Sequence, residues 1–261
     1  MEVVIAPDAE RAAGHVAAIV AGTLRRLAHP VLGLATGSSP LAAYRLLIDA
    51  HRRGQLSAAH ATAVLLDEYV GLPPDHPAGY RAFIRRELID QIDLPAERLF
   101  APDVEADDLG AACERYDRLL AELGGVDVQL LGIGTDGHIA FNEPGSSLAS
   151  RTRVKTLTRA TRADNARFFD GRVDDVPRHV VTQGLGTILE ARRLVLVATG
   201  AAKAEPIAAA VEGPLTAMCP ASLLQWHPKA TVVVDEEAAG GLRLADYYRE
   251  TFAAKPDWQR W

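Results

Sequence analysis

The stretch Val128-Gln-Leu-Leu-Gly-Ile-Gly-Thr-Asp-Gly-His-Ile-Ala-Phe-Asn-Glu-Pro144 joins a short apolar run to a glycine-rich turn. The run, residues 128–131, predicts a strand that ends at Gly132. The turn then brings Asp136, His138 and Glu143 close together in the chain. Two carboxylates and an imidazole are common components of a proton-transfer site. Because open α/β sheets bind ligands beyond the carboxyl ends of their strands, this turn is the first candidate active site.

The length of 261 residues suits one large α/β domain or two small ones, and the 48% of hydrophobic residues suffices for a sizeable core. No internal repeat, low-complexity tract or Gly/Ser linker divides the sequence, so we expect a single domain over residues 1–261. The formal net charge of -6 gives no reason to expect a nucleic acid or an anionic membrane as a partner.

The two cysteines, Cys113 and Cys219, lack the spacing of a metal site or a redox motif, as is typical of buried thiols in a reducing compartment. The first residues contain no basic region followed by a long apolar stretch, so we expect no signal peptide. No run approaches the roughly 18 apolar residues of a membrane span. We therefore expect a soluble cytoplasmic protein.

Short apolar runs alternate with helical patterns along the sequence. The runs predict strands at 3–5, 31–35, 64–66, 128–131, 194–198 and 231–234. The longer patterns predict helices at 8–27, 40–53, 79–91, 107–123 and 201–211. This alternation indicates the α/β class, with an open, mostly parallel sheet covered by helices on both faces in a Rossmann-like arrangement. Polar or glycine-containing turns follow four of the strands and should meet at one edge of the sheet.

Residues 151–178 differ from the rest of the chain in charge. They contain eight basic and four acidic residues, a local charge of +4 in a chain of net charge -6. The segment lies between two predicted strands, so it is a candidate mobile lid at about 151–182. A solvated helical surface is the other interpretation of the same charges.

Gly132, Gly134 and Gly137 match the GxGxxG pattern of dinucleotide sites. That interpretation requires a long helix after the third glycine and an acidic residue about 20 positions further on. Asn-Glu-Pro-Gly at 142–145 interrupts any helix, and no carboxylate lies near position 157. We therefore expect no nicotinamide cofactor, and we attribute the glycines to a sharp turn close to a substrate.

Thr36-Gly-Ser-Ser-Pro40 connects a predicted strand to a predicted helix. Backbone N–H groups and small hydroxyl side chains at a helix N-terminus bind phosphate well, although Ser38 or Ser39 could instead cap the helix. The GxxxxGK[ST] pattern is absent, which argues against a nucleoside triphosphate. A phosphate group on a smaller molecule fits this loop.

Asp67 and Glu68 end another predicted strand, where adjacent side chains point to opposite faces. One of them can therefore serve as a base in a pocket, unless both belong to a turn or a helix cap. Lys203 opposes the dipole at the start of a predicted helix, which is easier to explain if it contacts an anion. Asp136 and His138 lack a third ligand at metal spacing, so we expect no metal.

Several strings together resemble the glucosamine-6-phosphate deaminase (glucosamine/galactosamine-6-phosphate isomerase) family, and the resemblance covers most of the chain. They are Leu32-Gly-Leu-Ala-Thr-Gly-Ser-Ser-Pro40, Leu66-Asp-Glu-Tyr-Val-Gly-Leu72, the turn at 132–144, Ser146-Ser-Leu-Ala-Ser-Arg-Thr-Arg-Val-Lys-Thr-Leu157, Arg167-Phe-Phe169 and Leu224-Gln-Trp-His-Pro-Lys229. The resemblance implies a cofactor-free, hydrolytic conversion of D-glucosamine 6-phosphate and water to D-fructose 6-phosphate and ammonium. This reaction belongs to amino-sugar catabolism, including N-acetylglucosamine degradation.

Carried over by position, the family's roles fall on the residues already singled out. The resemblance implies that Asp67 removes the C2 proton of the sugar. It also implies that His138 opens the pyranose ring together with Asp136 and Glu143. The implied contacts to the substrate phosphate are Gly37, Ser38, Ser39, Arg167 and Lys203.

Regulation is a further implication of the resemblance. Bacterial members are often hexamers activated by N-acetylglucosamine 6-phosphate, whereas other members are monomeric and unregulated. The positions that match the effector's phosphate site are Ser146, Arg153, Lys155 and Thr156. Two other functions stay open: a 6-phosphogluconolactonase, which has the same fold, and a sugar-phosphate sensor domain without turnover.

Overall fold

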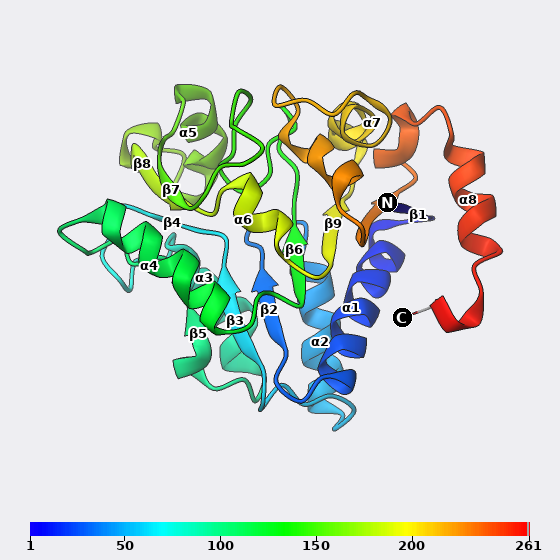
Figure 1. The fold of residues 1–261 in the computed structure, drawn as a ribbon, viewed down its shortest axis with the longest axis horizontal. Helices are drawn as coiled ribbons and strands as arrows, with labels where there is room; N and C mark the ends of the chain where they lie inside the picture. Colours follow the sequence, from blue (N-terminus) through cyan, green and yellow to red (C-terminus); the bar gives the residue numbers. More distant parts are fainter. Residues whose placement is uncertain (260) are drawn as a thin grey trace.

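Seven parallel strands form the large sheet of the protein, in the order β1–β10–β9–β6–β2–β3–β5 (Figure 1). Their bounds are β1 Glu2–Ala6, β2 Val31–Leu34, β3 Thr62–Leu65, β5 Leu99–Phe100, β6 Val128–Leu131, β9 Leu194–Ala198 and β10 Ala230–Asp235. The computed structural model describes residues 1–259 and 261. The predicted strands are all present, and the sheet is parallel as expected.

Burial explains why these strands pair in parallel. Every residue of β2, β6, β9 and β10 is buried, so both faces of the sheet are covered. The helices that accompany the sheet are α1 Ala9–Arg26, α2 Leu41–Arg52, α3 Tyr80–Glu87, α4 Leu109–Glu122, α6 Leu185–Leu189, α7 Ala204–Glu212 and α8 Ala245–Ala253. Helix α1 begins where Asp8 accepts a hydrogen bond from the backbone N–H of Arg11, and it packs on β1, β9 and β10.

The chain leaves the middle of the sheet in opposite directions. From β2 it crosses to β3 and then β5, whereas from β6 it crosses to β9 and then β10. Strands β2 and β6 are neighbours, so a crevice opens between the turns at their carboxyl ends. Such a switch point is the usual ligand site of an open α/β sheet.

A second, antiparallel sheet of three strands was not predicted. It consists of β4 Asp67–Tyr69, β8 His179–Thr182 and β7 Arg153–Thr156, in that order. Between β7 and β8 lie helix α5, Arg159–Asn165, and two short 3-10 turns. The segment expected to be a lid therefore begins and ends in strands, and only its middle part is helical.

Two hydrogen bonds join the small sheet to the large one. Gln183 follows β8, and its backbone N–H donates to the carbonyl of Leu66 at 2.7 Å. Its side-chain amide donates to the carbonyl of Leu65 at 2.9 Å. These bonds place β4, and hence Asp67, directly beyond the carboxyl end of β3. Within the described residues, no helix combines the length and the apolar composition that crossing a membrane requires.

Gly184 lies at the N-cap of α6, where the preceding loop passes very close to it. A Cβ atom at this position would lie 2.1 Å from the carbonyl oxygen of Ser150. Backbone atoms cannot yield as a flexible side chain can, so only glycine fits here. Gly14, in the middle of α1, has no atom within 4 Å of the corresponding position.

We predict that Gly184→Ala lowers the free energy of unfolding by about 1–3 kcal/mol, because the new methyl group overpacks against backbone. Gly14→Ala is the matched control and should raise it by up to about 1 kcal/mol, since alanine favours the helix. Urea unfolding measures both. Equal stability of Gly184→Ala and the wild type would show that the contact is not tight.

Candidate active site

A pocket of about 790 Å³ opens at the carboxyl ends of the central strands. Its walls come from the turns after β2, β3, β6 and β9 and from the segment around α5. The structure thus brings together most of the predicted site residues, which are far apart in the sequence. Those that line the pocket are Gly37, Ser38, Ser39, Asp67, His138, Arg167 and Lys203.

The turn after β2 forms one wall of this pocket. Gly37 adopts a φ of +88°, which allows the backbone to turn sharply before α2. The residue at the N-cap of α2 is Pro40, and no side chain caps this helix. The capping interpretation of Ser38 and Ser39 is therefore wrong, and both residues face a pocket instead.

Two cations also line this pocket, Lys203 and Arg167. Lys203, at the start of α7, donates from Nζ to the carbonyl of Ile133 at 2.7 Å. Burial lowers the pKa of Lys203, and the nearby guanidinium of Arg167 lowers it further. The Arg167 guanidinium also lies 4.8 Å from the centre of the Phe168 ring. Together these groups form a cationic end that attracts an anion.

Asp67 is a buried carboxyl group on another wall. It is 6% exposed, and burial raises its pKa well above the usual range, with a further rise from Glu68. Glu68 points away from the pocket, where its carboxylate accepts from the backbone N–H groups of Tyr80 and Arg81 at the start of α3. The expectation that only one of the pair faces the pocket is confirmed, and Glu68 is the helix-capping acid.

A cluster of aromatic rings lies at this part of the pocket, and the sequence did not predict it. Tyr80 lines the pocket and stacks on Phe141 at 5.9 Å between ring centres. Its hydroxyl donates to that of Tyr69 at 3.1 Å. Phe169 packs edge-on against Tyr69. Burial raises the pKa of both tyrosines, and the nearby charge of Asp67 raises it further. Tyr69 belongs to the Asp-Glu-Tyr string, but periodicity could not show which way it points.

His138 and Asp136 form the pair that was expected. The Nδ1 atom of His138 lies 2.6 Å from an Asp136 oxygen, which also accepts from the His138 backbone N–H at 3.1 Å. These contacts lower the pKa of Asp136, the side-chain hydrogen bond most of all. The imidazole lies over Gly134, where a Cβ atom would be 2.1 Å from the ring. This glycine therefore makes room for the histidine.

Glu143 has different neighbours from those expected. Its carboxylate accepts hydrogen bonds from the hydroxyl groups of Thr158 and Thr161, at the start of α5. Among the described residues, these threonines and not His138 are the side-chain partners of Glu143, and Glu143 does not line the pocket. Thr161 does line it, so Glu143 supports the wall from behind.

The predicted effector residues lie on and before β7. Ser146 is buried in the preceding loop, and its Oγ has no hydrogen-bond partner in the described structure. Arg153 and Lys155 share one face of β7, both partly buried, whereas Thr156 alternates to the other face. Burial lowers the pKa of Arg153. Arg153 and Lys155 can thus face one site from β7, whereas Thr156 points to the other side of the strand.

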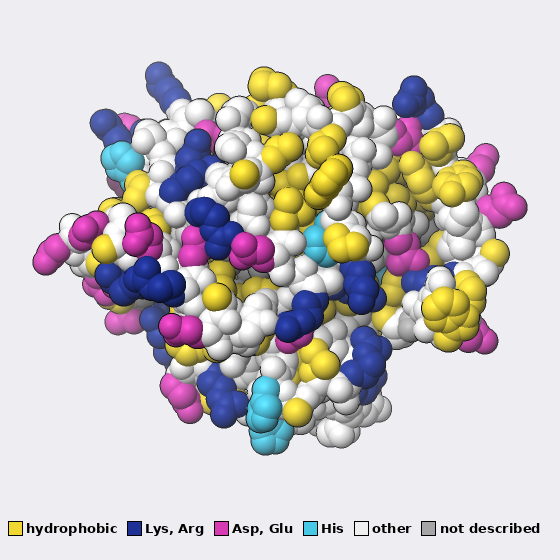
Figure 2. All heavy atoms as spheres, viewed as in Figure 1, with side chains coloured by type: hydrophobic (Ala, Val, Ile, Leu, Met, Phe, Trp, Pro, Cys, Tyr) yellow, Lys and Arg dark blue, Asp and Glu magenta, His cyan; other side chains and the backbone are white. Residues whose placement is uncertain are grey.

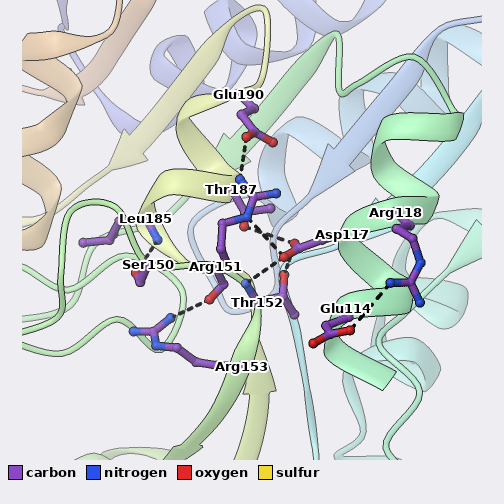
Figure 3. Close-up of polar contacts among 10 residues, drawn as sticks. All are labelled: Glu114, Asp117, Arg118, Ser150, Arg151, Thr152, Arg153, Leu185, Thr187 and Glu190. Atoms are coloured by element: carbon purple, nitrogen blue, oxygen red, sulfur yellow. Dashed lines mark hydrogen bonds and ion pairs between the residues drawn. The ribbon is translucent and has the colours of Figure 1, made fainter. Parts of the chain in front are cut away.

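A polar network holds the start of β7 in place (Figure 3). Asp117 on α4 accepts from the hydroxyl of Thr152 at 2.6 Å and from that of Thr187 at 3.1 Å. Arg151 donates to Asp117 at 3.3 Å and to Glu190 at 2.5 Å. The beginning of the predicted lid is therefore tied to α4 and α6. In the part of the chain that the structure describes, no group of three His, Cys, Asp or Glu side chains is arranged to hold a metal ion.

Curated proteins of known family match the whole chain. A glucosamine-6-phosphate deaminase of Streptomyces avermitilis is 58% identical over 259 residues, which cover 99% of each chain. The protein of the same description from Streptomyces coelicolor is 59% identical over an equal length, again with 99% of each chain covered.

Solved structures share the architecture. A structure described as a monomeric glucosamine-6-phosphate deaminase superposes with a TM-score of 0.89 at 43% identity, over 92% of this chain and 100% of the other. A 6-phosphogluconolactonase from Trypanosoma brucei superposes with a TM-score of 0.73 at 21% identity, over 92% and 98% of the two chains, a similarity of fold. Residues 7–234 match the model of the family described as glucosamine-6-phosphate isomerases/6-phosphogluconolactonase. The chain therefore belongs to this family of sugar-phosphate proteins.

Proposed function

We propose that the protein converts D-glucosamine 6-phosphate and water to D-fructose 6-phosphate and ammonium. The observation that carries this proposal is a single pocket lined by the buried carboxyl group of Asp67, the imidazole of His138 and the cation of Lys203. Such a pocket can hold a sugar by its phosphate and transfer protons at its other end. Relatives at 58% and 59% identity that are described as glucosamine-6-phosphate deaminases support the same reaction.

The phosphate is the anchor of the substrate in this proposal. Gly37, Ser38 and Ser39 offer backbone N–H groups and hydroxyls, and Lys203 and Arg167 supply positive charge. Burial lowers the pKa of Lys203, and repulsion from the Arg167 guanidinium lowers it further. A dianionic phosphate would relieve that repulsion, so binding energy at this end can position the reacting carbons.

His138 opens the sugar ring. A proton on Nδ1 is held by Asp136, which leaves Nε2 free to accept the proton of the anomeric hydroxyl. As that proton leaves, the bond between C1 and the ring oxygen breaks and C1 becomes an aldehyde. His138 then returns the proton to the ring oxygen. Asp136 fixes the orientation of the imidazole during both transfers.

Asp67 carries out the isomerisation. Its carboxylate removes the proton from C2 of the open-chain aldehyde, and the electron pair forms a double bond between C1 and C2 while O1 is protonated. Return of a proton to C1 moves the double bond to C2 and nitrogen. Water then adds to C2, and ammonia leaves to give the ketose. A raised pKa makes Asp67 a stronger base for this step once it is ionised.

Residues 151–182 act as a lid in this proposal, within a single domain over residues 1–261. The strands at its base are held by the Asp117 network and by the link from Gln183. The helical middle carries Arg167 and Thr161 into the pocket wall. Glu143 contributes by holding the first turn of α5, through Thr158 and Thr161, rather than by touching His138.

N-acetylglucosamine 6-phosphate is the proposed effector. The unpartnered hydroxyl of Ser146 and the partly buried cations of Arg153 and Lys155 support a phosphate site. Thr156 points to the other face of β7, so it can join this phosphate site only if the strand rotates. An allosteric hexamer in the cytoplasm is the corresponding assembly, although one solved structure that resembles this chain is described as a monomeric deaminase.

Two other functions follow from the same fold. A 6-phosphogluconolactonase hydrolyses a lactone and has no need of a base at C2, whereas this pocket contains Asp67 in dry surroundings. A sensor domain would bind the sugar phosphate without turnover, and it would have no need of the paired Asp136 and His138. Only the deaminase releases ammonium, so an assay for ammonium distinguishes it from both alternatives.

The direct test is an ammonium-release assay on glucosamine 6-phosphate, with and without N-acetylglucosamine 6-phosphate. We expect stoichiometric ammonium and fructose 6-phosphate, and a lower KM for the substrate when the effector is present. Hydrolysis of 6-phosphogluconolactone without ammonium release would favour the lactonase. Binding of glucosamine 6-phosphate without turnover would favour the sensor.

We predict that Asp67→Asn reduces kcat by about 100-fold or more, because it removes the general base, while substrate binding stays close to that of the wild type. The same variant should be more stable near neutral pH. The folded state holds the proton of Asp67 more tightly than the unfolded state does, so stability falls as pH rises from the ordinary aspartate range through the raised pKa. Asparagine has no ionisable proton, so the variant does not lose stability in this way as the pH rises.

Turnover assays and thermal unfolding at several pH values measure the two effects of Asp67→Asn. The gain in stability should be absent at low pH, where the wild-type carboxyl group is protonated in both states. Normal turnover of the variant would exclude Asp67 as the base, and a gain in stability that does not depend on pH would exclude the buried carboxylate as its cause.

His138→Gln should impair the cyclic substrate more than a substrate that is already open, because only the cyclic form requires proton transfer to the ring oxygen. We expect a loss of about 100-fold in kcat on the cyclic form. Two rates measure the difference. One is the turnover of the cyclic amino-sugar phosphate, and the other is the reverse reaction, in which open-chain fructose 6-phosphate and ammonium form the amino sugar. Equal losses in both assays would argue against a role in ring opening.

A further inference from the structure

A second hollow lies at the amino ends of the strands, at the opposite edge of the sheet from the active site. It has a volume of about 480 Å³ and is bounded by the last turns of α1 and α4 and by the residues before β6, β9 and β10. Four of its lining residues are Lys or Arg, namely Arg26, Arg192, Arg193 and Lys229, and one, Asp127, is acidic. Figure 2 shows Lys and Arg side chains gathered below the centre of this face, over the lower ends of β6 and β9 in Figure 1.

The acidic residue neutralises only one of these cations. One oxygen of Asp127 accepts from Arg192 at 3.0 Å, and the other accepts from the backbone N–H of Val31 at 2.8 Å. Arg192 also donates to the carbonyl of Gly124, just beyond α4, at 2.9 Å. Cations commonly complement the carbonyl end of a helix in this way, and Arg26 also lies in the last turn of a helix, α1. Arg193 and Lys229 precede strands and are not explained by helix ends.

Arg193 is the informative residue. Its Nη1 atom is buried and donates to no acceptor in the described structure. Burial lowers the pKa of Arg193, as does the nearby charge of Arg26, whereas Glu2 raises it. The Glu2 carboxylate is already 2.7 Å from Nζ of Lys255. A buried charged donor without an acceptor is destabilising, so its presence calls for an explanation.

We propose that this hollow binds a small molecule through a phosphate group held by Arg26, Arg193 and Lys229. A phosphate accepts several hydrogen bonds at once and matches the fork of a guanidinium, which would satisfy the buried Nη1 of Arg193. The volume suits a small metabolite. The concave shape and the overall negative charge of the chain argue against a nucleic acid. The site is distinct from the active pocket, so its occupant does not compete with the substrate.

Inorganic pyrophosphate is the probe, and isothermal titration of the full-length protein measures its binding. The expected result for the wild type is binding at two sites, one in each hollow. Arg193→Gln should lose the site at the amino ends of the strands, with at least about a tenfold weaker affinity there. Lys203→Gln should lose the other site. Arg45→Gln, which removes an exposed arginine from α2 and changes the charge equally, should bind as the wild type does.

Three outcomes would overturn the proposal. One is unchanged pyrophosphate binding in Arg193→Gln, and another is an equal loss in Arg45→Gln, which would indicate a general charge effect. The third is a marked loss of thermal stability of Arg193→Gln in anion-free buffer, which would make Arg193 structural. The proposal predicts a variant at least as stable as the wild type, since the unpaired donor is gone. Ammonium release by Arg193→Gln should remain normal, so a failure of this site and a failure of the proposed reaction are distinguishable.

Discussion

The opposite directions in which the chain leaves β2 and β6 are the constraint on which the site depends. Because neighbouring connections diverge at this point, the turns that follow the two strands face each other across a crevice. The first turn carries the two serines after Gly37, and the second carries His138. The adjacent β3 continues directly into the strand that holds Asp67. One feature of sheet topology thus gathers groups that are about a hundred residues apart in sequence.

The burial of ionisable side chains is the second feature that the binding sites share. The carboxyl group of Asp67 is buried beside Glu68, and the amine of Lys203 is partly buried beside another cation. Burial of either charged group costs stability, and such costs persist in proteins where function requires them. The hollow at the amino ends of the strands also contains a buried charged group, because Nη1 of Arg193 is a buried donor without an acceptor in the described structure. This parallel is the physical basis for considering it a binding site.

The sequence predicted the large sheet well because its strands are continuous apolar runs. The strand at 194–198 has the predicted bounds, and the pocket contains the phosphate-type loop, Asp67, His138, Arg167 and Lys203 as expected. The small sheet was missed because β7 alternates between partly buried and exposed residues, and its first and third residues are basic. The partners of Glu143 could not be predicted either, because they lie on a segment whose path depends on that unpredicted sheet. The pattern of apolar residues along the sequence predicts which segments are buried. Contacts between distant segments can be known only from the folded structure.

A structure of the protein with the reduced, open-chain alditol of glucosamine 6-phosphate tests the central claim most directly. This molecule keeps the phosphate and the amine but has no carbonyl group, so its C2 proton is not acidic. We expect its phosphate to lie among Ser38, Ser39, Arg167 and Lys203, with C2 within about 3.5 Å of the Asp67 carboxyl group. Binding in the reverse orientation, or with C2 far from Asp67, would contradict the account.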